Sequence, residues 1–391
     1  MQNDSKHVRL AGLDTLRALA IVLVLLSHYN GFVAKNSIFG FAGDAGWAGV
    51  DLFFVLSGYL IGNQILSPVS HGEPLDLKTF FARRLLRTLP NYYAVLAVYL
   101  LLPHSPIAGK TMAPVWRYLS FTQNIGLHYG ETFTHSWSLC IEEQFYLVLP
   151  LAVLALLRPG RSPRLLWCTL IAAVGVGIST RGINFINGEK AFSAPAYYST
   201  LCRFDELLPG VMIAMLKNFH PAFFTRFLRH GNALLAAGLA MVLSVLYGVL
   251  HEAPTPFLAS TFGFSLVAIG FGLLTCAALS PHSLLNRLRI PGAASLALWS
   301  YAAYLVHKPV FMALRPELTS RSIDPEAPLT IAAVMGVGVF AGWILYKLVE
   351  TPFMRLRARW YPTDASKKYI TSASTLPLTG SVVKLDQRFD R

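Results

Sequence analysis

The sequence predicts an all-α integral membrane protein, a bundle of about ten transmembrane helices with both termini in the cytoplasm. Of the 391 residues, 54% are hydrophobic and only 14% are charged, whereas a soluble domain carries about 25% charged residues. The mean hydropathy is +0.49. A water-soluble protein this apolar could not cover its core with polar surface, so lipid must solvate its apolar faces. The composition excludes a disordered chain and a secreted disulfide scaffold, and it argues against a soluble enzyme.

Long apolar stretches give the number of helices, because a membrane-spanning helix needs about 20 mostly apolar residues. Proline-containing breaks, such as those at Pro103 and Pro281, separate most of these stretches. Arg17 interrupts the first stretch, which favours a span over a cleavable signal peptide. The predicted spans are residues 10–32, 45–66, 87–103, 136–157, 165–181, 203–217, 233–251, 257–280, 292–314 and 327–350.

The distribution of basic residues predicts the orientation. The chain has 33 Lys and Arg residues against 20 Asp and Glu, a net charge of +13. With the N-terminus inside, the inner loops carry more than twice as many Lys and Arg residues as the outer loops. Cytoplasmic loops are enriched in these residues, so both termini are expected in the cytoplasm. The membrane surface, rather than a nucleic acid, then explains the basic excess.

The chain is expected to form one membrane domain, residues 1–360, followed by a polar cytoplasmic tail, residues 361–391, that we expect to be disordered. No internal repeat supports an inverted-repeat transporter. No two cysteines form a CxxC pair, and no metal site is expected. The four cysteines are Cys140, Cys168, Cys202 and Cys276.

Ionisable residues inside spans are costly and are usually functional or paired. The first predicted span contains Arg17 and His28, eleven residues apart. This spacing places both on one helix face, separated by about 16 Å along the axis. His28 is therefore expected towards the outer side and Arg17 towards the inner side. The alternative is a snorkelling arginine and an interfacial histidine.

The next two spans add further polar candidates. Asp51 stands near the outer end of the second span, where an acid also favours a helix N-terminus. Ser57 precedes Gly58, a pair typical of close helix packing. Arg84 and Arg87 are three residues apart, so they share a helix face and offer two guanidinium groups to phosphate. The alternative for this pair is simple anchoring at the inner membrane surface.

The fourth span contains the adjacent carboxylates Glu142 and Glu143. Neighbouring helical residues diverge by about 100°, so at least one of the two must face a polar interior. Glu142 is expected at about the depth of His28. Further polar residues are expected to line the same interior: Asp51 and Ser57 in the second span, Glu143 beside Glu142, Asp205 in the sixth span, and Tyr304 and His307 in the ninth. The predicted polar path has arginines on the inner half and histidines with carboxylates on the outer half.

Several of these pieces together resemble the acyltransferase-3 family of membrane O-acyltransferases, in its single-domain form. Each piece alone is weak, but their order and spacing from residue 13 to about residue 352 are specific. The matching pieces are Leu13–Ala20 with His28, Gly49–Gly58, Arg84–Arg87, Trp137–Leu139 with Glu142 and Phe145–Tyr146, and Ser300–His307.

The resemblance implies transfer of an acyl group, usually acetyl, from cytoplasmic acyl-CoA to a hydroxyl of a carbohydrate or lipid-linked glycan. It implies a multi-pass protein of the bacterial inner membrane that contacts lipid and no nucleic acid. The chemistry of the residues fits. Arg17, Arg84 and Arg87 are candidate contacts for the coenzyme A phosphates. His28 is the candidate base, and Glu142 is the candidate group that orients its ring. A covalent acyl-histidine remains an alternative to direct transfer.

Two other function classes are compatible with polar residues inside a bundle. A proton-coupled transporter or flippase also uses buried Glu, Asp and His. The arginine pair at the inner mouth argues against it. A non-catalytic scaffold or sensor would leave the carboxylates inside the spans unexplained.

Overall fold

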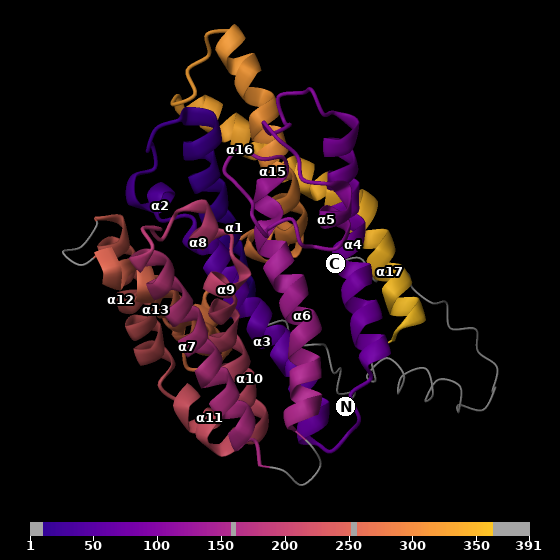
Figure 1. The fold of residues 1–391 in the computed structure, drawn as a ribbon, viewed down its shortest axis with the longest axis vertical. Coiled ribbons are helices and arrows are strands. Elements are labelled where there is room, and N and C mark those ends of the chain that lie inside the picture. Colours follow the sequence, from indigo (N-terminus) through magenta and orange to yellow (C-terminus); the bar gives the residue numbers. More distant parts are fainter. Residues whose placement is uncertain (1–10, 158–161, 252–255, 363–391) are drawn as a thin grey trace.

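The computed structural model describes residues 11–157, 162–251 and 256–362. All regular elements in this part of the chain are helical, and they pack side by side in an elongated bundle (Figure 1). The α-helices are α1 (Ala11–Tyr29), α2 (Gly40–Asp44), α3 (Ala48–Ser70), α4 (Leu77–Leu101), α5 (Val115–Leu119), α6 (Trp137–Leu156), α7 (Arg164–Ile186), α8 (Ala194–Tyr197), α9 (Thr200–Arg203), α10 (Leu208–Phe219), α11 (Pro221–Leu228), α12 (Gly231–Leu250), α13 (Pro256–Leu279), α14 (Leu284–Arg287), α15 (Ala293–Ser320), α16 (Pro328–Leu345) and α17 (Thr351–Trp360). Short 3₁₀ or π segments are η1 (Asn30–Ala34), η2 (Thr134–Ser136), η3 (Phe204–Leu207) and η4 (Tyr346–Glu350).

Seven helical segments of the described residues are long and apolar enough to cross a membrane. They include α1, α3, α6, α7, α12, α13 and α16 with its continuations. A further candidate, the segment from Thr200 to Phe219 followed by α11, is bent by 115°. This supports a multi-pass all-helical membrane protein, while the count of ten spans and their orientation stay predictions.

Helices α4 and α15 coincide with the third and ninth predicted spans but are not in that apolar set. The reason is their composition, because charged and polar side chains interrupt both. Helix α4 also starts ten residues earlier than the predicted span, at Leu77. Asp76 caps it by accepting a hydrogen bond from the backbone N–H of Thr79 at 3.0 Å, so the basic stretch before the span is helical too.

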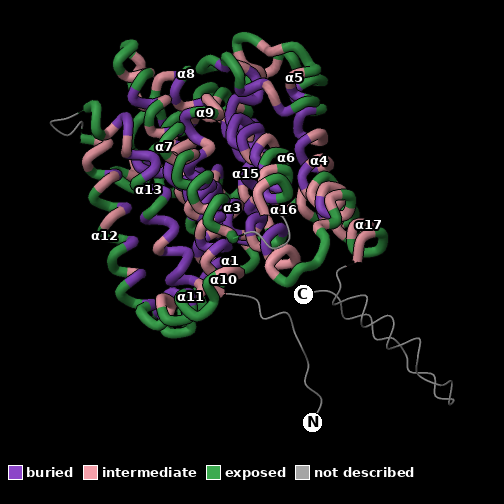
Figure 2. Tube along the Cα trace, turned by 60° about the horizontal axis from the view of Figure 1, so that its bottom comes forward, coloured by how far each residue is buried: buried purple, intermediate pink, exposed green. Residues whose placement is uncertain are grey.

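Helix α12, at the edge of the bundle, has one buried face and one exposed apolar face, as expected for a helix in contact with lipid. Helix α12 buries a stripe of Leu234, Gly238, Val242 and Leu246 against α13. Its opposite face exposes large apolar residues, including Leu243 and Tyr247. Figure 2 shows buried positions gathered in the middle of the bundle and exposed ones on its periphery. An apolar exposed face is stable in contact with acyl chains, not with water.

Close helix contacts hold the centre of the bundle. A Cβ atom on Gly58 of α3 would lie 2.0 Å from the backbone oxygen of Leu207, and one on Gly210 of α10 would lie 2.1 Å from that of Val55. These glycines let α3 and α10 approach backbone to backbone. Helix α1 packs on both α3 and α15. These contacts bring the polar side chains of α1, α3 and α15 into the same part of the bundle.

The predicted tail begins just beyond α17, which ends at Trp360. Its residues 363–391 lie outside the described part of the chain. Helix α17 lies along α4 (Figure 1), and Arg83 donates a hydrogen bond to the backbone oxygen of Tyr361 at 2.6 Å.

Candidate functional site

Two cavities lie within the bundle and share a wall. The first, of about 320 Å³, is lined by His28, His135 and Lys308, and we call it the histidine cavity. The second, of about 290 Å³, is lined by Arg17, Arg84 and Arg87, and we call it the arginine cavity. Val50 and Tyr304 line both. A molecule that occupied both cavities would therefore pass Tyr304.

A pair of histidines stands at the histidine cavity. His28, from the last turn of α1, and His307, from the middle of α15, approach with 2.6 Å between Nδ1 of His28 and Nε2 of His307. Their rings stack with centroids 4.8 Å apart. His307 is fully buried and does not line the cavity, so it stands behind His28.

The hydrogen bonds define the proton positions on this pair. Nδ1 of His307 lies 2.9 Å from the backbone oxygen of Ala303. A carbonyl oxygen only accepts, so Nδ1 of His307 carries the proton and its Nε2 is the acceptor when the ring is neutral. Nδ1 of His28 must then donate to that Nε2. In neutral His28 this leaves the lone pair on Nε2, the arrangement that a general base requires.

Two more residues of this cavity lay outside the sequence-based candidates. His135 donates from Nε2 to the backbone oxygen of Leu305 at 3.0 Å, and its ring centroid lies 5.7 Å from that of His307. Lys308 donates to the hydroxyl of Thr134. The sequence contains a signal for both residues. His135 directly precedes the fourth predicted span, and Lys308 is a charged residue inside the ninth.

The arginine cavity gathers the three predicted arginines and Glu142. Ser57 donates to Oε1 of Glu142 at 2.6 Å, and the guanidinium of Arg84 lies 4.2 Å from the ring centroid of Tyr146. Among the described residues, no carboxylate forms an ion pair with Arg17, Arg84 or Arg87. Their positive charges are therefore available to an anionic ligand.

The structure does not bring His28 and Glu142 together. Glu142 lines the arginine cavity and contacts Ser57, whereas His28 lines the histidine cavity and contacts His307 behind it. The reason is depth along α6. His135 stands at the level of the histidine pair, and Glu142 is seven residues further, about 10 Å along the helix. The adjacent Glu143 lines neither cavity.

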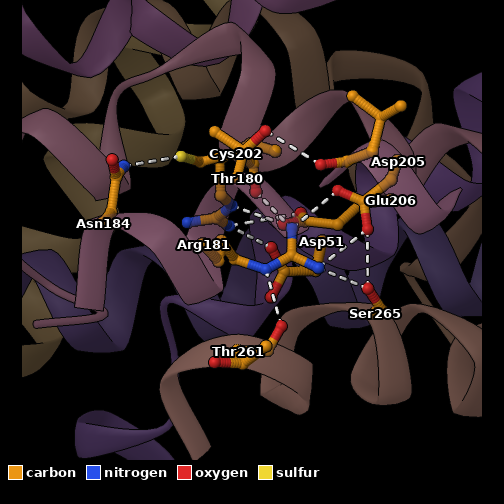
Figure 3. A network of polar contacts seen from close by, with 11 residues as sticks. Asp51, Thr180, Arg181, Asn184, Cys202, Asp205, Glu206, Thr261 and Ser265 are labelled. Atoms are coloured by element: carbon orange, nitrogen blue, oxygen red, sulfur yellow. Dashed lines mark hydrogen bonds and ion pairs between the residues drawn. The ribbon is translucent and has the colours of Figure 1, made fainter. Parts of the chain in front are cut away.

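Asp51 and Asp205 also line neither of these cavities, because both are held in buried ion pairs. Asp205 pairs with Arg181 at 2.7 Å, and Asp51 pairs with Arg203, which also pairs with Glu206. Figure 3 shows the two aspartates in one network with Arg181 and Ser265. This network joins α3, α7, α13 and the segment before α10. Its geometry indicates a structural role.

In residues 11–157, 162–251 and 256–362, no three His, Cys, Asp or Glu side chains are placed to hold a metal ion. The histidine rings instead contact each other and backbone oxygens.

Comparisons with known proteins give one family. The model of the acyltransferase-3 family, described as an acyltransferase domain, matches residues 10–347. The peptidoglycan O-acetyltransferase OatA of Listeria monocytogenes is 30% identical over 380 residues, which cover 91% of this chain and 58% of the relative. The O-acetyltransferase OatA of Staphylococcus aureus is 25% identical over 408 residues, with 97% and 64% covered. The chain thus spans about three fifths of the length of these relatives. No solved structure matches it.

Proposed function

The chain belongs to the acyltransferase-3 family, and from this premise we propose that it is a membrane O-acyltransferase that moves an acyl group, acetyl in the simplest case, from acyl-CoA to a hydroxyl of a carbohydrate. One observation carries the proposal. A cavity with three arginines that form no ion pair among the described residues shares a wall with a cavity lined by His28. The first suits the charged donor and the second suits the acceptor.

The donor side of the proposal rests on the arginine cavity. Coenzyme A carries phosphates, which guanidinium groups bind as bidentate forks. Arg84 and Arg87, one turn apart on α4, would hold the phosphates, with Arg17 deeper on α1. The thioester arm would then reach towards Tyr304 and the histidine cavity. The excess of Lys and Arg in the predicted inner loops supports an arginine cavity on the cytoplasmic side of a bacterial inner membrane, the side on which acyl-CoA would be supplied.

The acceptor side rests on the histidine cavity. Its walls are rich in aromatic rings, including Trp47, Trp137, Tyr197 and Tyr198. Tyr and Trp combine an apolar face with a polar group, which suits a sugar ring. The Listeria relative is named for peptidoglycan, so a cell-envelope glycan is the proposed acceptor class.

The chemistry proposed is direct transfer. Nε2 of His28 takes the proton of the acceptor hydroxyl while its oxygen attacks the thioester carbonyl carbon. The new C–O bond forms, the C–S bond breaks, and the coenzyme A sulfur leaves with the proton returned from His28. His307, through its bond to Nδ1 of His28, takes over the orienting role expected of Glu142. Glu142 instead holds Ser57 and lowers the net positive charge of the arginine cavity.

Alanine at both Arg84 and Arg87 is expected to weaken acyl-CoA binding by about tenfold or more, because two charge-assisted contacts to phosphate are lost. Lysine at both positions should restore only part of the affinity, since an ammonium is a point charge. Calorimetric titration of acetyl-CoA into the purified protein measures this.

The matched control is the double alanine variant of Arg226 and Arg229, an exposed pair with the same spacing that does not line the cavity. It should bind acetyl-CoA like the wild type. Equal affinity in the Arg84 and Arg87 variant would instead assign that pair to membrane anchoring alone.

A further inference from the structure

Lys308 is a buried lysine that lines the histidine cavity. Lys308 is 6% exposed. Its Nζ donates a hydrogen bond to the hydroxyl of Thr134 and lies 4.6 Å from the ring centroid of Phe32. Among the described residues, no carboxylate forms an ion pair with it. A hydroxyl and an aromatic face satisfy an ammonium only in part, so its charge is not neutralised by the protein.

The carboxylate that lines the same cavity does not serve as its counter-ion. Glu131, from the loop before η2, accepts a hydrogen bond from the backbone N–H of His128 at 3.0 Å. Of the three histidines nearby, His28 and His307 are hydrogen-bonded to each other, and His135 and His307 are each bonded to a backbone oxygen. Burial of a charge is costly unless an anion accompanies it. A ligand bound in the histidine cavity beside Lys308 can supply that anion.

We propose that Lys308, together with the Thr134 hydroxyl, binds a carboxylate on the acceptor, so that the acceptor class is an acidic carbohydrate such as a uronic acid. The proposal rests on the proposed function, because it places the bound sugar next to His28. A single ammonium matches a singly charged carboxylate, whereas the phosphate-binding pattern of several guanidinium groups lies in the other cavity.

A pair of probes that differ only in charge tests this in the wild-type protein. Methyl glucuronoside and its methyl ester have the same ring hydroxyls, and only the first carries a negative charge. Calorimetric titration of the purified full chain, without donor, should give an affinity for the acid that is about tenfold to a hundredfold higher than for the ester, as a charge-assisted contact provides.

Lys308→Met removes the charge and keeps an unbranched side chain that is one heavy atom shorter. It should abolish the preference for the acid and leave ester binding within about twofold, a difference of under 1 kcal/mol. Lys35→Met is the matched control. Lys35 also lies over the Phe32 ring, at 5.7 Å, but it is exposed and does not line the cavity. This variant should keep the full preference for the acid.

Equal affinity of the wild type for acid and ester, or no binding of the acid at millimolar concentration, would overturn the proposal. So would a Lys308→Met variant that keeps the preference. A Lys308→Met variant that binds both probes with unchanged affinity but no longer acylates either would also overturn the proposal. Lys308 would then stabilise the reaction rather than bind the carboxylate of the acceptor. A charge preference that depends on Lys308, without acyl transfer to either probe, would support the binding site while contradicting the proposed function.

Discussion

Alanine in place of His28 is expected to lower acyl transfer by about a hundredfold to ten-thousandfold, the range that loss of a general base produces. His28 alone of the paired histidines lines the cavity, and its Nε2 is free for the acceptor proton. The measurement is the rate of acetyl transfer to a glycan acceptor by detergent-purified protein that elutes as one species. His251→Ala, at the exposed end of α12, is the control and should keep the wild-type rate.

The partner of His28 makes this prediction more specific. His307→Phe keeps a ring but removes the acceptor for Nδ1 of His28, and it should cost about tenfold or more in kcat. The His28→Ala and His307→Phe double variant should be little worse than His28→Ala, because residues that act as one unit are strongly non-additive. Losses that multiply would separate His307 from the reacting group. Substantial turnover in His28→Ala would place the base elsewhere.

Removal of the Arg203 side chain is expected to have the largest effect on stability. Arg203 is fully buried and pairs with both Asp51 and Glu206. Arg203→Met would leave two carboxylates buried without a counter-charge, so the free energy of unfolding should fall by about 3–5 kcal/mol, as for other broken buried pairs. Thermal unfolding in detergent measures the change.

The matched control is the exposed pair of Arg321 and Glu317, whose side chains are 72% and 64% exposed. Arg321→Ala should change the free energy of unfolding by less than about 1 kcal/mol, because solvent screens exposed pairs. An Arg203→Met variant as stable as this control would contradict a structural role for the buried network.

Hydropathy could predict the helices whose stabilisation comes from burial in lipid. It could place α1, α3, α6, α7, α12, α13 and α16, because each is a continuous apolar stretch. It placed the start of α4 at residue 87 because a charged helical extension carries no apolar signal. The break between α10 and α11 depends on tertiary packing, so periodicity alone could not give its angle.

Helical spacing could predict which side chains share a face, but not which residue of another helix they meet. Arg84 and Arg87 do line one cavity, as their spacing indicated. His28 meets His307 instead of Glu142, because a difference of two helical turns is smaller than the error of a depth estimated from predicted span ends. The sequence predicts Asp51 and Asp205 as cavity residues, whereas the structure holds both in buried ion pairs. Their partners Arg203 and Arg181 lie at the ends of predicted spans. An arginine at the end of a span is usually interpreted as a membrane-surface residue, so the sequence did not indicate these buried ion pairs.

The most direct test of the account is release of the coenzyme A thiol from acetyl-CoA by the purified chain, measured with and without a glycan acceptor. Direct transfer predicts thiol release that requires the acceptor, equals the acetyl group gained by it, and disappears in His28→Ala. No thiol release, together with acceptor-independent movement of a glycan or of protons across proteoliposomes, would contradict an acyltransferase and indicate a transporter.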